Sequence, residues 1–482
     1  LSELLPAGAG AKSAKFVASG TLASGVTVAL KSDGTVEAIS ATSVPVSIPT
    51  TASPITYDTT ATYYNVSQFH PTNANIFVIA YGDAGSSFYG TAIVGTVSGN
   101  SITFSTPSVF ESAGIFNISI AFDASNPSNF VIAYTDQGNS NRGTAVIGTI
   151  SGTSLSYGTP VAFTTGAAAD NIGVDFVSSN KFVVAYQDGG NSNYGTAIVG
   201  TVSGSSISYG SASVFESAST YGCALKGDPN AADVFVVAYL DNGNSNYGTA
   251  IVGTVSGSSI SYGSATVFKA AAIGSTENGI SFDPNTANKF VIMFVSSSVF
   301  TAIIGTRSGT SLSFGSGAAI QNNSVTNPSI SYNPNTANEF LIAYRNNGNS
   351  NYGTATVCTV SSSTITVGTS YIYNAYLSNY NTLAFDPSTS GKFAVSFYNA
   401  AASPTTVSST ILGQLAGTSN NSADFIGITS EAISNTATGA INTYGGINTA
   451  QTGLTIGSDY YVQADGSLST TTSTVKAGQA VS

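Results

Sequence analysis

The chain repeats itself at a fixed interval. The segment Tyr186–Phe215 recurs almost unchanged as Tyr239–Phe268, and weaker copies begin at Tyr81, Tyr134, Phe294, Tyr344 and Phe397. Successive copies start 50 to 55 residues apart, which makes seven units. Such a period is the signature of a repeat architecture, in which each unit completes its core against its neighbours. The repeat therefore constrains the fold more than any other feature of the sequence.

Each unit contains four strand-like runs. In the fourth unit they are Cys223–Asp228, Val234–Tyr239, Gly248–Val255 and Ser259–Phe268. All are rich in β-branched and aromatic residues and end at Asp, Asn, Pro or Gly turns. The second and third runs are apolar at consecutive positions, as in strands covered on both faces. Four-stranded units of this length predict the blades of a β-propeller, because the alternative, a β-solenoid, normally has shorter repeats.

The connections predict how the strands are ordered. The longest link in the fourth unit, Lys269–Asn278, should cross from an outermost strand to the next innermost strand. The outermost type is missing from the seventh unit, which stops at Ser408–Leu415, but a matching run, Ser53–Tyr64, precedes the first unit. We therefore predict an all-β fold in which residues 51–415 form a seven-bladed propeller of four-stranded blades. An N-terminal strand closes the ring and removes its open edge.

Ring closure brings the two flanks together. We expect residues 1–50 and 416–482 to form one small β domain. Gly20–Glu37 and Gly453–Ser469 each hold two short apolar runs around an Asp-Gly pair, which is a strong hairpin signal.

The composition excludes several kinds of partner. The formal net charge is −11, with only 12 Lys and Arg residues, so neither nucleic acid nor an anionic membrane surface is expected. No apolar run approaches the roughly 20 residues of a membrane span, and no signal peptide is recognisable. The chain begins with Leu1, so we expect processing or a start further upstream. Cys223 and Cys358 occupy non-equivalent positions in different units, which predicts two buried free thiols.

A loop of the form Asp-x-Gly-Asn-Ser-Asn-Tyr-Gly recurs at Asp188–Gly195 and Asp241–Gly248. Its alternating oxygens could hold a weak Ca²⁺ ion at Asp188 and at Asp241. Each loop offers a single carboxylate, however, so we favour a hairpin turn with Gly and Asn at positive φ and Asp as the cap. No other cofactor is expected.

The strand directions place these loops on the same face as the crossovers between blades. Tyrosine rings and asparagine amides that repeat on such a face suit sugars, because amides bond hydroxyl groups. The alternative is that the rings only cover the strand ends. The candidate ligand-binding residues are Tyr194, Asn191, Tyr247, Asn244, Tyr352 and Asn349.

The sequence is poor in catalytic candidates, and we do not expect an enzyme. His70, beside Pro71, is interpreted as a turn residue. The aspartates that follow the innermost strands recur at one position, as expected for turn caps, at Asp123, Asp228, Asp283 and Asp386. Asp175 and Lys226 break the repeat, and we keep Asp175 as a candidate ligand-binding residue in the central channel.

The flanks carry a resemblance. Ala18–Val36 (ASGTLASGVTVALKSDGTV) together with Phe425–Ser482 (FIGITSEAIS…VKAGQAVS) resembles a β module of tailed-phage virion proteins, notably tail-fibre and appendage proteins of marine phages. This resemblance implies a structural virion protein that is extracellular or part of a particle. Its end module would bind other virion proteins within an oligomeric assembly, and its propeller would meet host surface glycans. Two alternatives remain open: a secreted glycan-cleaving propeller enzyme, and a bacterial surface or matrix scaffold.

Overall fold

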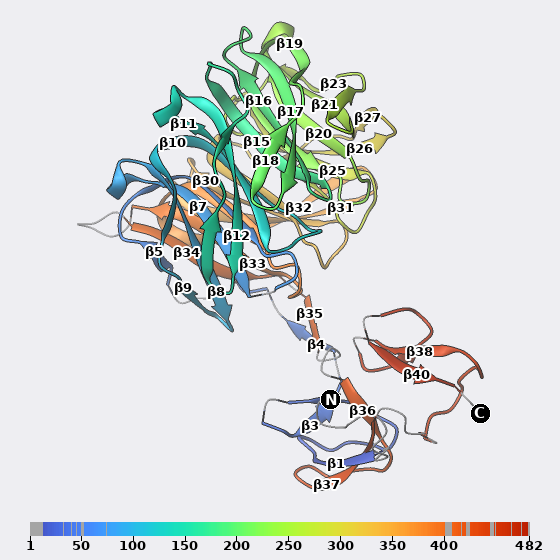
Figure 1. Ribbon diagram of the computed structural model, residues 1–482. Helices are drawn as coiled ribbons and strands as arrows, with labels where there is room; N and C mark the ends of the chain where they lie inside the picture. The colour runs from blue at the N-terminus through green and yellow to red at the C-terminus, as the bar shows by residue number, and fades with distance from the viewer. Residues whose placement is uncertain are drawn as a thin grey trace. The chain divides into compact units, whose positions relative to one another are not determined.

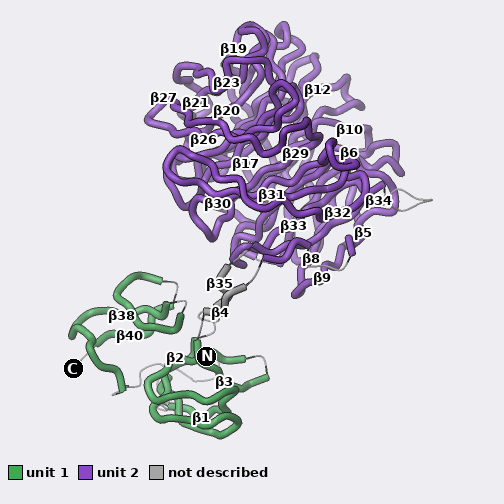
Figure 2. Tube along the Cα trace, turned by 180° about the vertical axis from the view of Figure 1, so that it is seen from behind, with its two compact units in different colours: residues 1–45, 416–482 green, residues 46–415 purple. Residues whose placement is uncertain are grey.

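The computed structural model describes residues 13–31, 33–39, 41–44, 46–49, 53–73, 75–400, 407–415, 417–420, 425–443, 448, 450–463, 465–473 and 475–480. The chain divides into two compact units, residues 1–45 with 416–482 (unit 1) and residues 46–415 (unit 2) (Figure 2). Unit 2 thus begins at Val46 and not at residue 51, because Ser47 and Gln414 exchange two backbone hydrogen bonds of 2.8 Å. The Leu1 start lies outside the described residues.

Unit 2 is built from β-strands that pair antiparallel in a recurring order of innermost, second, third and outermost strand (Figure 1). We label successive copies of this order as sheets 1 to 7 along the chain, and copies that share a long strand, such as β10, form one continuous hydrogen-bonded sheet. The innermost strands are β6 (Thr62–Phe69), the second half of β10 (Ser108–Phe122), β15 (Ala169–Ser178), the second half of β19 (Ser213–Gly227), β24 (Gly279–Phe282), β29 (Val325–Tyr332) and the end of β32 (Thr364–Phe385). The second strands are β7 (Ile76–Asp83), β11 (Asn129–Asp136), β16 (Lys181–Asp188), β20 (Val234–Asp241), β25 (Lys289–Ser296), β30 (Glu339–Asn346) and β33 (Lys392–Asn399).

The third strands are β8 (Tyr89–Ser98), β12 (Arg142–Ser151), β17 (Tyr194–Ser203), β21 (Tyr247–Ser256), β26 (Val299–Ser308), β31 (Tyr352–Ser361) and β34 (Val407–Gln414). Short strands then form the outermost position: β9 (Ser101–Phe104), β13 (Ser154–Tyr157), β14 (Val161–Ala162), β18 (Ser206–Tyr209), β22 (Ser259–Tyr262), β23 (Thr266–Ala272), β27 (Ser311–Phe314), β28 (Ala318–Gln321) and β5 (Ile55–Asp58). Among the described residues, no helix is long and apolar enough to cross a membrane.

The core lies between neighbouring sheets and is formed largely by their second and third strands, as the two-sided apolar pattern of these strands predicts. Phe235 of β20 packs over Gly253 of β21, where a Cβ atom would lie 2.1 Å from the ring. The same pairing recurs in most sheets, and in sheet 6 Cys358 takes the place of the glycine opposite Phe340. Cys223 and Cys358 are both buried and free, as expected.

The outermost strand differs from the expectation. The run Ser259–Phe268 is not one strand: it breaks at Gly263–Ala265 into β22 and β23, and both pair with β21. The connection between neighbouring sheets is also not always a loop. The strands β10, β19 and β32 each run unbroken from the outermost position of one sheet to the innermost position of the next. These connecting segments are the crossovers, and the edge of unit 2 that carries them is the crossover face.

Neighbouring innermost strands are joined by side-chain hydrogen bonds. The backbone N–H of Val174 donates to Ser119 Oγ (3.1 Å), and that of Leu383 donates to Ser329 Oγ (3.0 Å). Sheets 7 and 1 are joined in the same way, because Ser67 N–H donates to Thr382 Oγ1 (2.8 Å). On the outer side, β5 pairs with β34 and completes sheet 7 with an N-terminal strand. The innermost strands therefore follow one another around a common axis in a propeller-like all-β fold.

Unit 1 contains strands from both ends of the chain. Its five-stranded sheet has the order β1 (Ser13–Val17), β37 (Thr438–Asn442), β36 (Phe425–Thr429), β2 (Thr27–Leu30), β3 (Val36–Ala38). A three-stranded sheet contains β39 (Leu468–Ser469), β38 (Asp459–Val462) and β40 (Lys476–Gln479), and β4 (Ala41–Val44) pairs with β35 (Gly417–Asn420). The expected Asp-Gly hairpins are present, with Gly34 and Gly466 at φ +81° and +82°.

Candidate functional site

The repeated loops are tight turns bonded to the crossovers. Asp241 begins the 3-10 turn η3 (Asn242–Asn244), and Ser245 and Asn246 follow at φ +56° and +61°. The positive-φ residues are thus Ser and Asn, and the expected role of the glycine is wrong. Gly243 is required by close approach instead, since its Cβ atom would lie 2.5 Å from that of Ala218. Asn246 O then accepts a hydrogen bond from Ile273 N–H (3.0 Å), which ties the loop to the crossover.

The predicted Tyr and Asn residues lie in these loops and at the strands that follow. Tyr194, Tyr247 and Tyr352 are the half-buried first residues of β17, β21 and β31. The asparagines Asn191, Asn244 and Asn349 are exposed at the loop tips. Each Tyr/Asn pair belongs to a different sheet, so these residues repeat around the face and do not converge on one site.

The loop aspartates act as caps. Asp188 Oδ1 accepts from Gly190 N–H (3.0 Å), and Asp241 Oδ1 accepts from Asn244 N–H (3.1 Å). No group of three metal-ligating side chains occurs among the described residues. The geometry at Asp188 and Asp241 is therefore that of a turn.

The turns that follow the innermost strands are also capped by the expected residues. Asp283 Oδ1 accepts from Asn285 N–H (2.9 Å), and His70 Nδ1 accepts from Thr72 and Asn73 N–H (3.2 and 3.1 Å). His70 thus occupies the place of a capping aspartate, as its interpretation as a turn residue implied.

Asp175 and Lys226 form an ion pair between sheets 3 and 4. Lys226 Nζ lies 3.0 Å from Asp175 Oδ2, and the same oxygen accepts from Gly227 N–H (2.9 Å). The side chain of Asp175 is only 10% exposed. Its carboxylate is therefore engaged in joining two sheets and does not line the hollow described next.

A hollow of about 400 Å³ opens on the axis of unit 2. All seven innermost strands contribute to its wall. Five of them contribute asparagine, at Asn65, Asn117, Asn171, Asn327 and Asn381, and Asn278 lies directly before a sixth, β24. Sheet 4 supplies Gly222 and Cys223 instead. Burial raises the pKa of the Cys223 thiol to about 12, so it stays protonated at neutral pH. We call this cavity the axial hollow.

Several amides of the axial hollow are engaged with a neighbouring strand. Asn117 Nδ2 donates to Asp170 Oδ1 (3.1 Å), and Asn327 Oδ1 accepts from Tyr380 N–H (3.1 Å). Asn65 differs, because it is only 6% exposed and neither its Nδ2 nor its Oδ1 has a partner among the described residues. A buried amide without hydrogen bonds costs about 1–3 kcal/mol. Asn65 therefore presents an unmet donor and acceptor within the wall of the hollow.

Two tyrosines of the axial hollow have a left-handed backbone. The pairing of β10, β15 and β29 with their second strands shifts register at one point. Asn117, Asn171 and Asn327 lie at the start of these shifts and have φ between +47° and +52°. Asparagine tolerates this region well, but bulky side chains rarely adopt it. Tyr64 and Tyr380 nevertheless hold φ +57° and +51° at the equivalent positions. Strain of this kind gathers at functional sites.

These two tyrosines belong to an aromatic cluster at the junction of sheets 7, 1 and 2. The cluster consists of Tyr63, Tyr64, Phe88, Phe116, Tyr380 and Tyr398, with neighbouring ring centroids 5.2–6.3 Å apart. Phe88 is 41% exposed and Tyr64 36%. Burial raises the pKa of Tyr64 and of Tyr380, so both hydroxyl groups keep their protons. Polar amides and exposed aromatic rings therefore meet at one side of the axial hollow.

The sequence contained the signal for this site. Asparagine recurs at or near the start of the innermost runs, at Asn65, Asn117, Asn171, Asn278 and Asn381, and tyrosine precedes it at Tyr64 and Tyr380. The candidate residues were instead drawn from the loop between the second and third strands, where the repeat is strongest.

No protein-family model and no curated protein matches the sequence. Among solved structures, the chain resembles the BP39L lectin from Burkholderia pseudomallei, with a TM-score of 0.54 and 10% identity over 76% of this chain and 99% of that one. AofleA from Arthrobotrys oligospora is more distant, with a TM-score of 0.44 and 11% identity over 73% and 96% of the two chains. At this identity the likeness to BP39L concerns the fold alone.

Proposed function

We propose that unit 2 is a seven-bladed β-propeller that binds carbohydrate at the axial hollow. The observation that carries the proposal is the buried amide of Asn65, which has a free donor and a free acceptor beside exposed aromatic rings. Ligand sites combine apolar walls with a few well-placed polar groups. A sugar matches this combination, since its hydroxyl groups donate and accept while the apolar face of its ring packs on Tyr64 or Tyr380. The lectin fold of BP39L agrees with this proposal.

The proposed function is binding without chemical change. Asp175, the carboxylate kept as a candidate from the sequence, is held by Lys226 and by Gly227 N–H. In the proposal, unit 1 attaches the protein to a particle, and the resemblance of Ala18–Val36 and Phe425–Ser482 to tailed-phage virion modules makes a phage appendage the preferred setting. Its partners there are other virion proteins in an oligomer, and unit 2 meets host surface glycans outside the cell.

Binding to bacterial surface polysaccharides tests the proposal. Full-length protein and three variants, Asn65→Leu, Tyr380→Ala and Tyr194→Ala, are compared on a glycan array and by calorimetry with the best ligand. Tyr380→Ala should weaken binding at least tenfold, which corresponds to about 1.4 kcal/mol, and Tyr194→Ala should leave it unchanged. Retained binding in Asn65→Leu and Tyr380→Ala with a loss in Tyr194→Ala would return the site to the repeated loops.

Asn65→Leu also separates function from stability. Leucine keeps the volume but removes two polar atoms without partners, so the variant should unfold at a higher temperature while it binds glycan less tightly. Shortening of the polysaccharide by the wild-type protein, abolished by Asp175→Asn, would show an enzyme instead. Particles that lack the protein in mass spectrometry and immunogold imaging would overturn the phage setting.

A further inference from the structure

The junctions between neighbouring sheets share a buried arrangement. Where sheet 1 meets sheet 2, Phe110 packs on Tyr134 (centroids 5.4 Å apart), and the tyrosine hydroxyl donates to Glu111 Oε2 (3.1 Å). Sheets 3 and 4 repeat this arrangement with Phe215, Tyr239 and Glu216, where the hydroxyl-to-carboxylate distance is 3.2 Å. In both, the glutamate follows the phenylalanine of the outermost strand. At each junction the glutamate carboxylate therefore accepts a hydrogen bond from a buried tyrosine.

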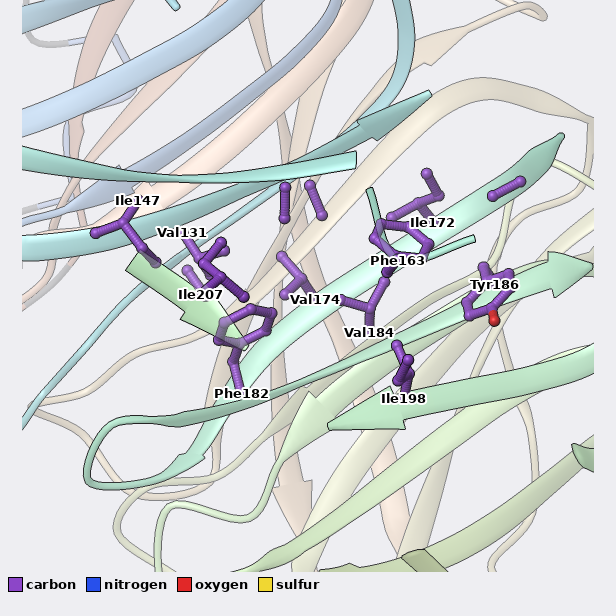
Figure 3. Packing of buried hydrophobic residues seen from close by; sticks show 14 of the residues in the cluster. Val131, Ile147, Phe163, Ile172, Val174, Phe182, Val184, Tyr186, Ile198 and Ile207 are labelled. Carbon is purple, nitrogen blue, oxygen red and sulfur yellow. The ribbon is translucent and has the colours of Figure 1, made fainter. Parts of the chain in front are cut away.

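The junction between sheets 2 and 3 departs from this arrangement. Phe163 and Tyr186 pack as the other pairs do, with centroids 5.1 Å apart, but Thr164 stands in the place of the glutamate. The Thr164 hydroxyl does not bond Tyr186, because its Oγ1 accepts from Gly143 N–H (3.0 Å) and donates to Ala167 O (2.9 Å). Tyr186 is 1% exposed, and its hydroxyl has no partner among the described residues. Figure 3 shows Phe163, Tyr186 and Ile198 at the same end of the packed cluster.

The chain path opens space beside this hydroxyl. From Phe163 to Ala169 the crossover takes one residue more than from Phe215 to Thr220, although Ala169 and Thr220 pair with equivalent aspartates. The strand β14 ends at Ala162. A hollow of about 380 Å³ results, lined by Phe163, Thr164, Tyr186, Asp188, Ile198 and Tyr209 among others. We call it the junction hollow.

The polar groups of the junction hollow select one kind of ligand. The Tyr186 hydroxyl is a donor without an acceptor, and Asp188 supplies a half-buried carboxylate, which only accepts. An anionic ligand would satisfy the tyrosine but face the charge of Asp188, and an ammonium group could not accept from the tyrosine. A hydroxyl group does both, because it accepts from one partner and donates to the other. The rest of the wall is mixed, with the aromatic rings of Phe163 and Tyr209 beside Thr164 and Thr165.

We propose that the junction hollow is a second binding site, separate from the axial hollow, for a neutral hydroxylated ring such as a terminal neutral monosaccharide. A ring hydroxyl accepts from Tyr186 Oη and donates to Asp188, and the apolar face of the ring packs on the aromatic wall. This inference rests on the proposed binding of carbohydrate by unit 2, but it places recognition at residues outside the axial hollow.

The test uses the full-length protein and a panel of neutral methyl pyranosides, with uronic acids and amino sugars for comparison. Binding is followed by saturation-transfer NMR and calorimetry in wild type, Thr164→Glu, Tyr186→Phe and Tyr134→Phe. Phenylalanine already occupies the tyrosine position in sheets 5 and 7, as Phe294 and Phe397, so Tyr186→Phe is expected to fold. Tyr134→Phe is the matched control at a junction filled by Glu111.

Thr164→Glu should abolish binding of the neutral monosaccharide, because the new carboxylate takes the place of the ligand. Tyr186→Phe should weaken it about three- to tenfold, the effect of one hydrogen bond, and Tyr134→Phe should not change it. Unchanged binding in both Thr164→Glu and Tyr186→Phe overturns the junction site, and so does a preference for uronic acids or amino sugars.

The axial variant Tyr380→Ala separates the two proposals. If it loses the glycan while Thr164→Glu keeps every interaction, the axial site stands and the junction site fails. If Thr164→Glu alone loses a monosaccharide, the junction site stands without the axial one. Absence of binding by the wild-type protein to all saccharides overturns both.

Discussion

The ring centroids of Tyr64 and Tyr380 lie 5.3 Å apart, and both residues have a left-handed backbone conformation at the axial hollow. They come from opposite ends of the repeat array, one from the first innermost strand and one from the last. Asparagine or glycine takes the equivalent position in sheets 2, 3, 4 and 6. The repeats therefore depart from their common sequence pattern where the first and last innermost strands meet.

Replacing Tyr64 should raise the stability of the protein and weaken the binding proposed for the axial hollow. Tyr64→Asn puts at this position the residue that sheets 2, 3 and 6 use, so we expect the free energy of unfolding to rise by about 1 kcal/mol as the strain is relieved. The proposed carbohydrate binding should weaken, because the aromatic ring is lost. Denaturant unfolding and calorimetry measure the two effects. Tyr376→Asn is the control, since Tyr376 is 55% exposed. A less stable Tyr64→Asn protein would contradict the strain argument.

The closing strand depends on Ser408. Its buried Oγ accepts from Thr62 N–H (3.0 Å) and donates to Thr60 O (3.2 Å), and it lies 2.8 Å from Thr62 Oγ1. Ser408→Ala leaves the buried Thr62 N–H without an acceptor and should cost about 1–3 kcal/mol in denaturant unfolding. Ser101→Ala, at an exposed position of β9, serves as the control. Equal unfolding midpoints for the two variants would count against closure through β5.

A buried ion pair joins sheets 4 and 5. Arg307 Nε and Nη2 lie 3.0 and 2.8 Å from Asp228 Oδ2, and the two side chains are 10% and 0% exposed. Arg307→Met leaves the carboxylate buried without its cation, so we expect a loss of about 3–5 kcal/mol in unfolding free energy. The double variant Arg307→Met/Asp228→Asn should recover part of that loss. A double variant that is as unstable as Arg307→Met would show that packing, and not the stranded charge, sets the cost.

The glutamates at the sheet junctions make stability depend on pH. Burial raises the pKa of Glu111 and of Glu216, and the nearby carboxylates of Asp136 and Asp241 raise it further. A carboxyl whose pKa is raised in the folded protein binds its proton more tightly there than in the unfolded chain. Stability from these groups therefore increases as the pH falls from 7 towards the raised pKa.

Thermal unfolding at pH 7 and pH 5 measures this effect. The gain in Tm on acidification should be larger in the wild-type protein than in Glu111→Gln/Glu216→Gln, which has no proton to take up at these positions. The double variant Glu37→Gln/Glu431→Gln, in unit 1, controls for the change in net charge, since it also removes two carboxylates. A gain that is the same in all three proteins would contradict the assignment.

The sequence predicted the strands of unit 2 well where their signal is local. Phe235, Gly253 and their equivalents recur with the period, and apolar residues on both faces indicate strands between other layers. The break at Gly263–Ala265 was missed because a single run of strand-forming residues does not reveal where a sheet edge bends. The left-handed Ser245 and Asn246 were missed for a related reason, since glycine is the usual residue at positive φ but here meets the Cβ atom of Ala218.

The period of the chain by itself determined the repeated four-stranded pattern, because each unit must bury both faces of its strands against the next. Only the tertiary structure decided where the two proposed binding sites lie. Asn65, Tyr64 and Tyr380 are far apart in sequence and meet because the first and last innermost strands are neighbours. The unpartnered hydroxyl of Tyr186 depends on a threonine and one extra residue in the preceding sheet. Both proposed sites lie where a residue departs from the repeat. The sequence shows such a departure, but only the folded structure shows which atoms surround it.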